Sequence, residues 1–92
     1  MIGTFRSKPL ADLFRTGKSA KIDARVQARV LRRLDALNEA SSASDMDIPG
    51  FDFHALRGFD PPRYTVHVNG PWCITFSFAD GDAFDVDFEQ YH

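Results

Sequence analysis

The chain has 92 residues, of which 43% are hydrophobic and 26% are charged. This length and composition predict one globular domain over residues 1–92, and nine Phe, two Tyr and one Trp argue against disorder. The sequence has no membrane-spanning apolar run and no signal-peptide block in residues 1–20, so we expect a cytoplasmic protein with no membrane partner. The single cysteine, Cys73, excludes an internal disulfide and a zinc site built from several cysteines.

The net charge of −2 conceals two halves of opposite sign. Residues 1–33 carry nine basic and two acidic groups, whereas residues 34–92 carry two basic and eleven acidic groups. A basic segment on an acidic body indicates a polyanion, or an acidic partner, bound on one side. A solvated basic helix face neutralised by the acidic half explains the same pattern, and the charge alone leaves both interpretations open.

Two helices are predicted in the N-terminal half. Residues 2–5 alternate in polarity and favour a short first strand. An early Pro9, apolar residues at helical spacing and a following Gly17 predict a helix over about 8–16. A stripe of Val and Leu predicts a longer helix from about Asp23 to Asn38, with Asp23 at its positive end. The arginines of this second helix fall mostly off the stripe, which predicts a basic outer surface made of Arg25, Arg29, Arg32 and Arg33.

After a polar connector at 39–50, the period of apolar residues changes to two, which is typical of strands. Strands are predicted at 51–56 and at about 64–68, 72–78 and 84–88, with the last two joined by an Asp-Gly turn. Phe84, Val86 and Phe88 are expected on the apolar face, and Asp85, Asp87 and Glu89 on the polar face. We therefore predict an α+β fold, with two N-terminal helices packed on one face of a small antiparallel sheet.

Chemistry is expected on the polar face or at the strand ends, because the apolar face is needed for helix packing. Cleavage of RNA without a metal needs a base for the 2′-hydroxyl, an acid for the leaving 5′-oxygen and fixed positive charge at the phosphate. His54 and His92 are suited to the first two tasks and Arg57 to the third. Tyr91 is able to stack on a base or to donate a hydrogen bond.

Each candidate also has a simpler structural interpretation. His67 is explained as an ordinary strand residue, and His54 as a packing residue in a Phe-rich strand. Trp72 is most simply a core residue, and Arg57 and Arg63 are most simply surface charges.

Two other chemistries compete with RNA cleavage. His54, His67, His92 and Cys73 supply enough ligands for zinc by number, but they lack the short paired spacing of zinc sites. Cys73 as a nucleophile with a histidine partner rests on no motif. The sequence contains no Gly-rich phosphate loop and no G-x-S-x-G elbow.

Three motifs occur together in this chain. It begins Met-Ile-x-x-Phe, followed by Leu-x-x-Leu-Phe-x-x-Gly. The middle block is Phe53-His54-Ala55-Leu56-Arg57-Gly58. The last part reads Val68-Asn69-x-x-Trp72-x-Ile74-x-Phe76 and ends in Tyr91-His92. In this order and spacing, nearly end to end, the sequence resembles the HigB-type toxins, also called plasmid-maintenance killer proteins, of the RelE superfamily.

The resemblance implies a RelE-like fold and a bacterial toxin that enters the ribosomal A site, beside 16S rRNA, and cleaves translated mRNA without a metal or cofactor. It also implies a HigA-like antitoxin with a helix-turn-helix domain, through which alone the pair reaches operator DNA. By position, His54 matches the active-site histidine and Arg57 the basic residue that contacts phosphate. Tyr91 and His92 match the catalytic C-terminal pair.

Two positions depart from the family pattern. Cys73 stands where the family has an arginine on the active face, and its loss removes a contact worth about 2.7–4 kcal/mol in the transition state. Gln90 stands where the family has an aspartate before Tyr-His, and this loss removes an orienting or proton partner for a catalytic histidine. Asp85, Asp87 and Glu89 add negative charge to the same face, which opposes the approach of RNA.

Three functions are therefore carried forward. The leading hypothesis is an endoribonuclease acting through His54 and His92, assisted by Arg57 and Tyr91, with Arg25, Arg29 and Arg32 holding 16S rRNA phosphates. The second is a catalytically impaired member of the same fold that acts by binding the antitoxin or the ribosome. The third, a small metal-dependent hydrolase, is supported by no motif.

Overall fold

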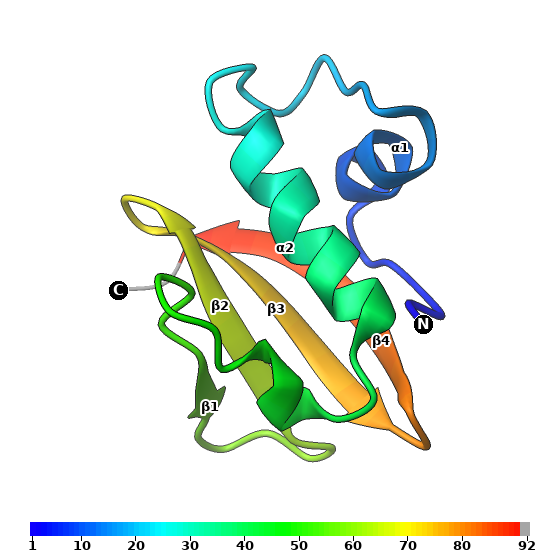
Figure 1. Ribbon diagram of the computed structural model, residues 1–92, viewed down its shortest axis with the longest axis vertical. Coiled ribbons are helices and arrows are strands. Elements are labelled where there is room, and N and C mark those ends of the chain that lie inside the picture. The colour runs from blue at the N-terminus through cyan, green and yellow to red at the C-terminus, as the bar shows by residue number, and fades with distance from the viewer. Residues whose placement is uncertain (91–92) are drawn as a thin grey trace.

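A computed structural model describes residues 1–90, which form two α-helices, one 3-10 helix and a four-stranded sheet (Figure 1). The strands lie in the order β1-β2-β3-β4, and every neighbouring pair is antiparallel. The predicted α+β fold is confirmed. No helix in residues 1–90 has the length and apolar character that a membrane span requires. In chain order the elements are α1 (Lys8–Thr16), α2 (Gln27–Glu39), η1 (Ala43–Met46), β1 (His54–Leu56), β2 (Arg63–Asn69), β3 (Trp72–Ala79) and β4 (Asp82–Gln90).

Helix α1 has the ends that the sequence predicts. The hydroxyl of Ser7 accepts a hydrogen bond from the Leu10 N–H at 3.2 Å, which satisfies one free donor of the first turn. Gly17 ends the helix at a φ of 78°, and its N–H donates to the Leu13 carbonyl at 2.8 Å. The helix therefore has a side-chain cap at its start and a glycine at its end.

Helix α2 begins later than predicted, at Gln27 rather than near Asp23. The Asp23 carboxylate accepts hydrogen bonds from the backbone N–H of Arg25 at 2.9 Å and from its Nη2 at 2.7 Å. The side-chain and backbone hydrogen bonds from Arg25 lower the pKa of Asp23 to about 2. Asp23 thus holds a turn before the helix instead of interacting with the helix dipole.

The first segment and the first strand are both shorter than predicted. Residues 2–5 make only two isolated parallel bridges to β4, Ile2 with Ala83 and Phe5 with Val86. Strand β1 covers His54–Leu56 instead of 51–56, since Asp52 has a φ of 48°, which extended backbone does not allow.

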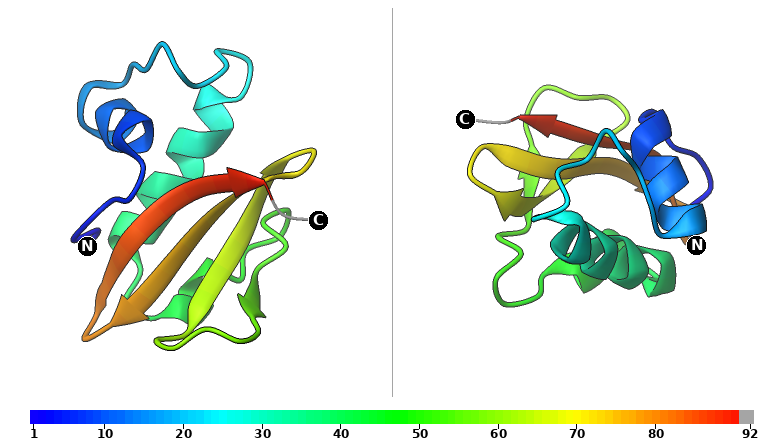
Figure 2. Two further views of the ribbon diagram at one scale, coloured as in Figure 1. Left: turned by 180° about the vertical axis from the view of Figure 1, so that it is seen from behind. Right: turned by 90° about the horizontal axis from the view of Figure 1, so that it is seen from above.

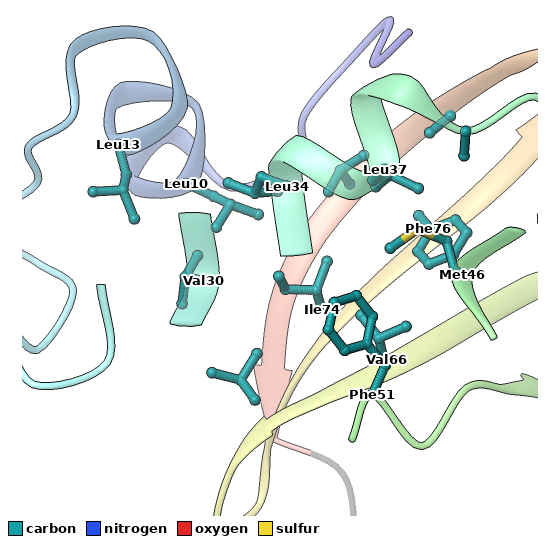
Figure 3. Close-up of a cluster of buried hydrophobic side chains, with 14 of the residues drawn as sticks. Leu10, Leu13, Val30, Leu34, Leu37, Met46, Phe51, Val66, Ile74 and Phe76 are labelled. Carbon is teal, nitrogen blue, oxygen red and sulfur yellow. The ribbon is translucent and has the colours of Figure 1, made fainter. Parts of the chain in front are cut away.

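One face of the sheet, the inner face, packs against the helices and forms the core (Figure 3). Val66, Ile74 and Phe76 are fully buried beneath α2 and η1. Burial of each such side chain contributes about 1.5–3 kcal/mol of transfer free energy. The helical residues that complete the core are Leu10 and Leu13 of α1, Val30, Leu34 and Leu37 of α2, and Met46 of η1.

A β-bulge in β4 corrects the predicted faces of this strand. Thr75 pairs with Asp87, but Ser77 pairs with Phe84, so β4 has one residue more than β3 between these two pairs. Asp85 lies in this irregular stretch with a φ of 51°. Ala83 and Val86 are therefore buried in the core, whereas Phe84 lies on Ser77's side of the sheet. The expectation that Phe84 belongs to the apolar face is wrong.

Arg33 was expected on the basic outer surface of α2, and this expectation is also wrong. Its side chain is buried, with the guanidinium 4.5 Å from the centre of the Phe51 ring. Nε donates to the His67 carbonyl at 2.6 Å, and the two Nη atoms donate to the carbonyls of Arg29 and Gly50. One side chain thereby ties α2 to β2 and to the loop that leads into β1.

We expect Arg33→Met to lower the free energy of unfolding by about 2–3 kcal/mol, because it leaves the His67 and Gly50 carbonyls without a charged donor. Urea denaturation followed by circular dichroism measures the change. The matched control is Arg32→Met on the same helix, where the side chain is exposed and a change within about 0.5 kcal/mol is expected. Equal losses in the two variants would contradict the bridging role.

Candidate active site

No helix in residues 1–90 covers the second face of the sheet, which we call the outer face (Figure 2, left). Residues paired across strands point to the same face, and neighbours along a strand point to opposite faces. The pairing therefore places on the outer face His54, Leu56, Arg63, Thr65, His67, Cys73, Thr75, Ser77, Phe84, Asp87 and Glu89.

His54 lies in β1 opposite Thr65, and its side chain is exposed. The interpretation of His54 as a packing residue is therefore wrong. Its Nδ1 lies 3.0 Å from the Asp52 carbonyl, which fixes the ring and leaves Nε2 as the nitrogen able to exchange a proton with a substrate. Arg57 follows in the turn after β1 and is also exposed, so these two candidates lie three residues apart at one edge of the sheet.

Cys73 lies on the outer face of β3, between His67 of β2 and Glu89 of β4. Its side chain is 8% exposed, and Sγ is 3.9 Å from the Pro71 carbonyl. The Nε2 of His67 is 2.9 Å from the Gly70 carbonyl, so this histidine has a partner in its own turn. The position brings no charge to the outer face.

Arg63 was expected to be a surface charge, and this expectation is wrong because only 4% of the residue is exposed. Nη1 donates to the Asp85 carbonyl at 2.8 Å and to the Ser77 hydroxyl at 3.4 Å. Nη2 donates to the Thr75 hydroxyl at 2.9 Å, and that hydroxyl donates to Oε2 of Glu89. Within residues 1–90, all of these direct acceptors of Arg63 are neutral.

Burial is the main cause that lowers the pKa of Arg63, and the positive charge of Arg6 adds to it. The negative charges of Glu89, Asp85 and Asp87 oppose this shift. A guanidinium nevertheless stays charged in proteins. The outer face therefore contains a buried positive charge, that of Arg63. The nearby acidic residue Glu89 is linked to this charge through the Thr75 hydroxyl and not by a direct ion pair.

Thr65 lies on the outer face between His54 and Thr75 and is 1% exposed. Its hydroxyl has no hydrogen-bond partner among residues 1–90. A buried hydroxyl without a partner costs stability and calls for an explanation, such as a catalytic role or a water molecule.

Gln90 pairs with Trp72, one position beyond the Cys73–Glu89 pair. Alternation places its exposed side chain on the inner-face side of β4, away from His54. Tyr91 and His92 lie outside the described residues, so their catalytic roles stay predictions.

The three arginines expected to bind RNA lie on the helical side of the sheet, and all three are exposed. Arg25 precedes α2 and pairs with Asp23, while Arg29 Nη1 donates to Asn69 Oδ1 in the β2–β3 turn at 3.1 Å. A cleft of about 480 Å³ lies beside α1 on the same side and includes Lys8, Lys18 and Lys21 in its lining. This cleft is remote from the outer face, so we do not identify it with the site of chemistry.

Trp72 was expected in the core but is 36% exposed. Its indole stacks on Phe88, with ring centres 4.7 Å apart and planes 17° apart. The alternation places Trp72 on the inner face correctly, but the residue sits at the end of the sheet.

Residues 1–90 contain no group of three or more His, Cys, Asp and Glu side chains placed to hold a metal ion. His54, His67 and Cys73 are therefore not gathered into a zinc site by the described part of the chain. The fourth ligand of that hypothesis, His92, lies outside it.

A family model described as the RelE-like toxin of the type II toxin-antitoxin system HigB matches residues 3–92. The chain belongs to the HigB-like toxin family. Among curated proteins, Endoribonuclease HigB from Proteus vulgaris is 32% identical to this toxin over 92 residues, which are 100% of both chains. The family resemblance expected from the motifs is confirmed.

The Thr65 hydroxyl gives a stability prediction. We expect Thr65→Val to raise the free energy of unfolding by about 1 kcal/mol, because it removes a buried hydroxyl that has no partner among residues 1–90. The matched control, Thr75→Val, removes a hydroxyl bonded to both Arg63 and Glu89 and should lower it by about 1–2 kcal/mol. Both are read from urea denaturation curves. A loss of stability in Thr65→Val would mean that the hydroxyl has a partner.

Proposed function

We propose that this toxin is an endoribonuclease that cleaves mRNA on the ribosome and thereby inhibits translation. The observation that carries the proposal is an exposed His54, with one ring nitrogen fixed by the backbone, on the sheet face that no described helix covers. Full-length similarity to a protein named Endoribonuclease HigB supports the same activity.

In the proposed reaction, His54 and His92 transfer the protons, and Arg57 neutralises the scissile phosphate. Tyr91 stacks on a base or donates a hydrogen bond. Gln90 stands where the family resemblance implies an aspartate, but its side chain lies on the inner-face side of β4, so we assign it no proton transfer at His54. No metal or other cofactor takes part in this scheme. His54 and Arg57 are both exposed, in β1 and in the turn that follows it, which supports their joint action on one nucleotide.

The RNA-binding surface and the site of chemistry lie on opposite sides of the sheet in this proposal. Arg25, Arg29 and Arg32 lie on the helical side of the sheet, whereas the phosphate attacked by the 2′-hydroxyl of the RNA lies beside His54 on the outer face, so the arginines contact a different RNA segment. Phosphates of 16S rRNA beside the A site fit this requirement, since the mRNA codon is then held on the outer face. Ribosomes also place the reaction in the cytoplasm.

A type II toxin has a cognate antitoxin, and we propose that here it is a HigA-like protein with a helix-turn-helix domain. The antitoxin masks the basic helices or blocks entry into the ribosome. Operator DNA is contacted only through the antitoxin.

A second candidate is a toxin with impaired catalysis that acts by binding the antitoxin or the ribosome. The observation that favours it is Cys73, which is buried and uncharged at the position where the family resemblance implies an arginine. Gln90 favours it as well, because an amide is not a proton-transfer group.

Primer extension on mRNA in programmed ribosomes tests the activity directly. We expect cuts within the A-site codon, none on free mRNA, and a rate about 10²–10⁴-fold lower for His54→Ala and for His92→Ala. The matched control is His67→Ala, another histidine of the outer face, which should cleave like the unmodified toxin.

The outcomes separate the candidates. Cuts only from the Cys73→Arg/Gln90→Asp double variant would favour the binding toxin. Cutting of free mRNA that is lost in chelator would favour a metal-dependent hydrolase. Equal cutting by His54→Ala would remove His54 from the site.

Ribosome binding tests the arginines on the helical side. Replacing Arg25, Arg29 and Arg32 by Glu should weaken binding and flatten the slope of log affinity against log salt by about two to three, because each lost phosphate contact releases fewer counterions. The control replaces Lys8, Lys18 and Lys21 by Glu, which changes the net charge equally. Equal effects of the two triple variants would assign the binding to net charge instead of to this surface.

A further inference from the structure

The outer face holds a chain of hydrogen bonds that the scheme above does not use. Arg63 of β2 donates from Nη2 to the Thr75 hydroxyl of β3, and this hydroxyl donates to Oε2 of Glu89 in β4. These hydrogen bonds therefore connect β2, β3 and β4 on the face on which His54 lies.

The direction of these hydrogen bonds is fixed by their chemistry. A guanidinium only donates, so the Thr75 oxygen must accept from Arg63, and its one proton is left for Glu89. Oε2 is thereby held by a donor, which leaves Oε1 of the carboxylate to accept from another group. Since Arg63 is buried, it has little freedom to release Thr75.

Glu89 is the carboxylate of β4 best placed to act on the outer face. Gln90 lies on the inner-face side of the strand, as its pairing with Trp72 shows. Asp87 also lies on the outer face, and its Oδ1 accepts from the backbone N–H of Phe88 at 2.9 Å, but within residues 1–90 it has no hydrogen bond to Thr75 and is not joined to Arg63 through this hydroxyl. Glu89 is partly exposed and bonded only through Oε2 within residues 1–90.

The separation between Glu89 and His54 suits a phosphodiester between them. The Glu89 carboxylate is bonded over β3, and β3 is two strands from β1, so the backbones beneath the two groups are roughly 10 Å apart. A base and an acid that each hydrogen-bond one of the two apical oxygens of an in-line displacement are roughly 9 Å apart. Thr65 lies between them, and its buried hydroxyl has no hydrogen-bond partner in residues 1–90.

We propose that Glu89 accepts the proton of the attacking 2′-hydroxyl of the mRNA, with Arg63 and Thr75 as positioning residues. This inference rests on the proposed function and changes it in one respect: Glu89 is the base and His54 the acid, so that His92 contacts the scissile phosphate instead of transferring a proton. The 2′-oxygen forms a bond to phosphorus, the bond from phosphorus to the 5′-oxygen breaks, and the 2′-hydroxyl proton passes to Glu89. The leaving 5′-oxygen takes a proton from the imidazolium of His54. Afterwards Glu89 releases its proton to water, and His54 takes up a proton from water.

The test uses the full-length toxin on mRNA-programmed ribosomes, with the single-turnover rate and the ribosome affinity measured separately. Glu89→Gln should lower the rate by about 10²–10⁴-fold and leave the affinity unchanged. The matched control is Asp87→Asn, a carboxylate of the same strand and face, which should keep the rate. The Thr75→Val variant should cleave mRNA slowly, whereas Thr75→Ser should cleave it at nearly the unmodified rate, because serine keeps the hydroxyl. Circular dichroism verifies that each variant is folded.

A second readout distinguishes a base from a structural carboxylate. Formate added to Glu89→Ala should recover part of the rate relative to chloride at equal ionic strength, and Gln90→Asp in the Glu89→Gln background should not. A Glu89→Gln toxin that cleaves like the unmodified one, formate without effect, or rescue by Gln90→Asp would each overturn the inference while the proposed function stands. An unmodified toxin that cuts no mRNA would overturn the proposed function and the inference together.

Discussion

Two short helices cover only one face of a four-stranded sheet, and this one-sided burial governs the rest of the molecule. The inner face takes the apolar residues of every strand, such as Ile74 and Phe76, and packs them under α2. The outer face must then satisfy its polar groups mainly with one another, because the described chain supplies no helix there. Arg63, Thr75 and Glu89 are joined for this reason, and the Thr65 hydroxyl has no partner in the described part of the chain. Thr65, Thr75 and Ser77 at the centre of the outer face are buried, so a substrate reaches this face at its exposed edge, where His54 lies.

The two faces also separate the charges that the sequence mixes along the chain. The exposed arginines at α2 lie on the helical side, and the acidic residues of β4 lie toward the outer face. On that face the negative charge is partly offset by Arg6, which pairs with Asp85 at 3.7 Å, and by buried Arg63. At position 73 this toxin thus has a cysteine instead of the family's arginine, but the buried guanidinium of Arg63 lies elsewhere on the same face. This distribution of charge agrees with the proposal that rRNA phosphates are bound on the helical side of the sheet and mRNA is cleaved on the outer face.

Hydrophobic periodicity, an early proline and a terminal glycine were sufficient to predict α1 and the faces of β2 and β3. They did not predict the bulge, because Asp85 adopts a positive φ that no local motif announces, and Phe84 changed faces as a result. They also misplaced Arg33 and Arg63, since a long charged side chain is buried only when distant carbonyls and hydroxyls meet it. Those partners lie on other elements, so they are visible only in three dimensions. For the site itself, the motif identified His54 and Arg57, whereas the part of Glu89 emerged from the register of β3 and β4.

The central claim is that mRNA lies on the outer face of the sheet, and a photo-crosslink tests it most directly. A 4-thiouridine in the A-site codon, with a 2′-O-methyl group at the cleavage position to prevent cutting, is irradiated on toxin-bound ribosomes, and the linked peptides are identified by mass spectrometry. The account predicts crosslinks to outer-face residues of β1, β3 and β4, with those around His54 and Cys73 foremost. Crosslinks confined to α1 and α2 would contradict it, because the codon would then lie on the helical side.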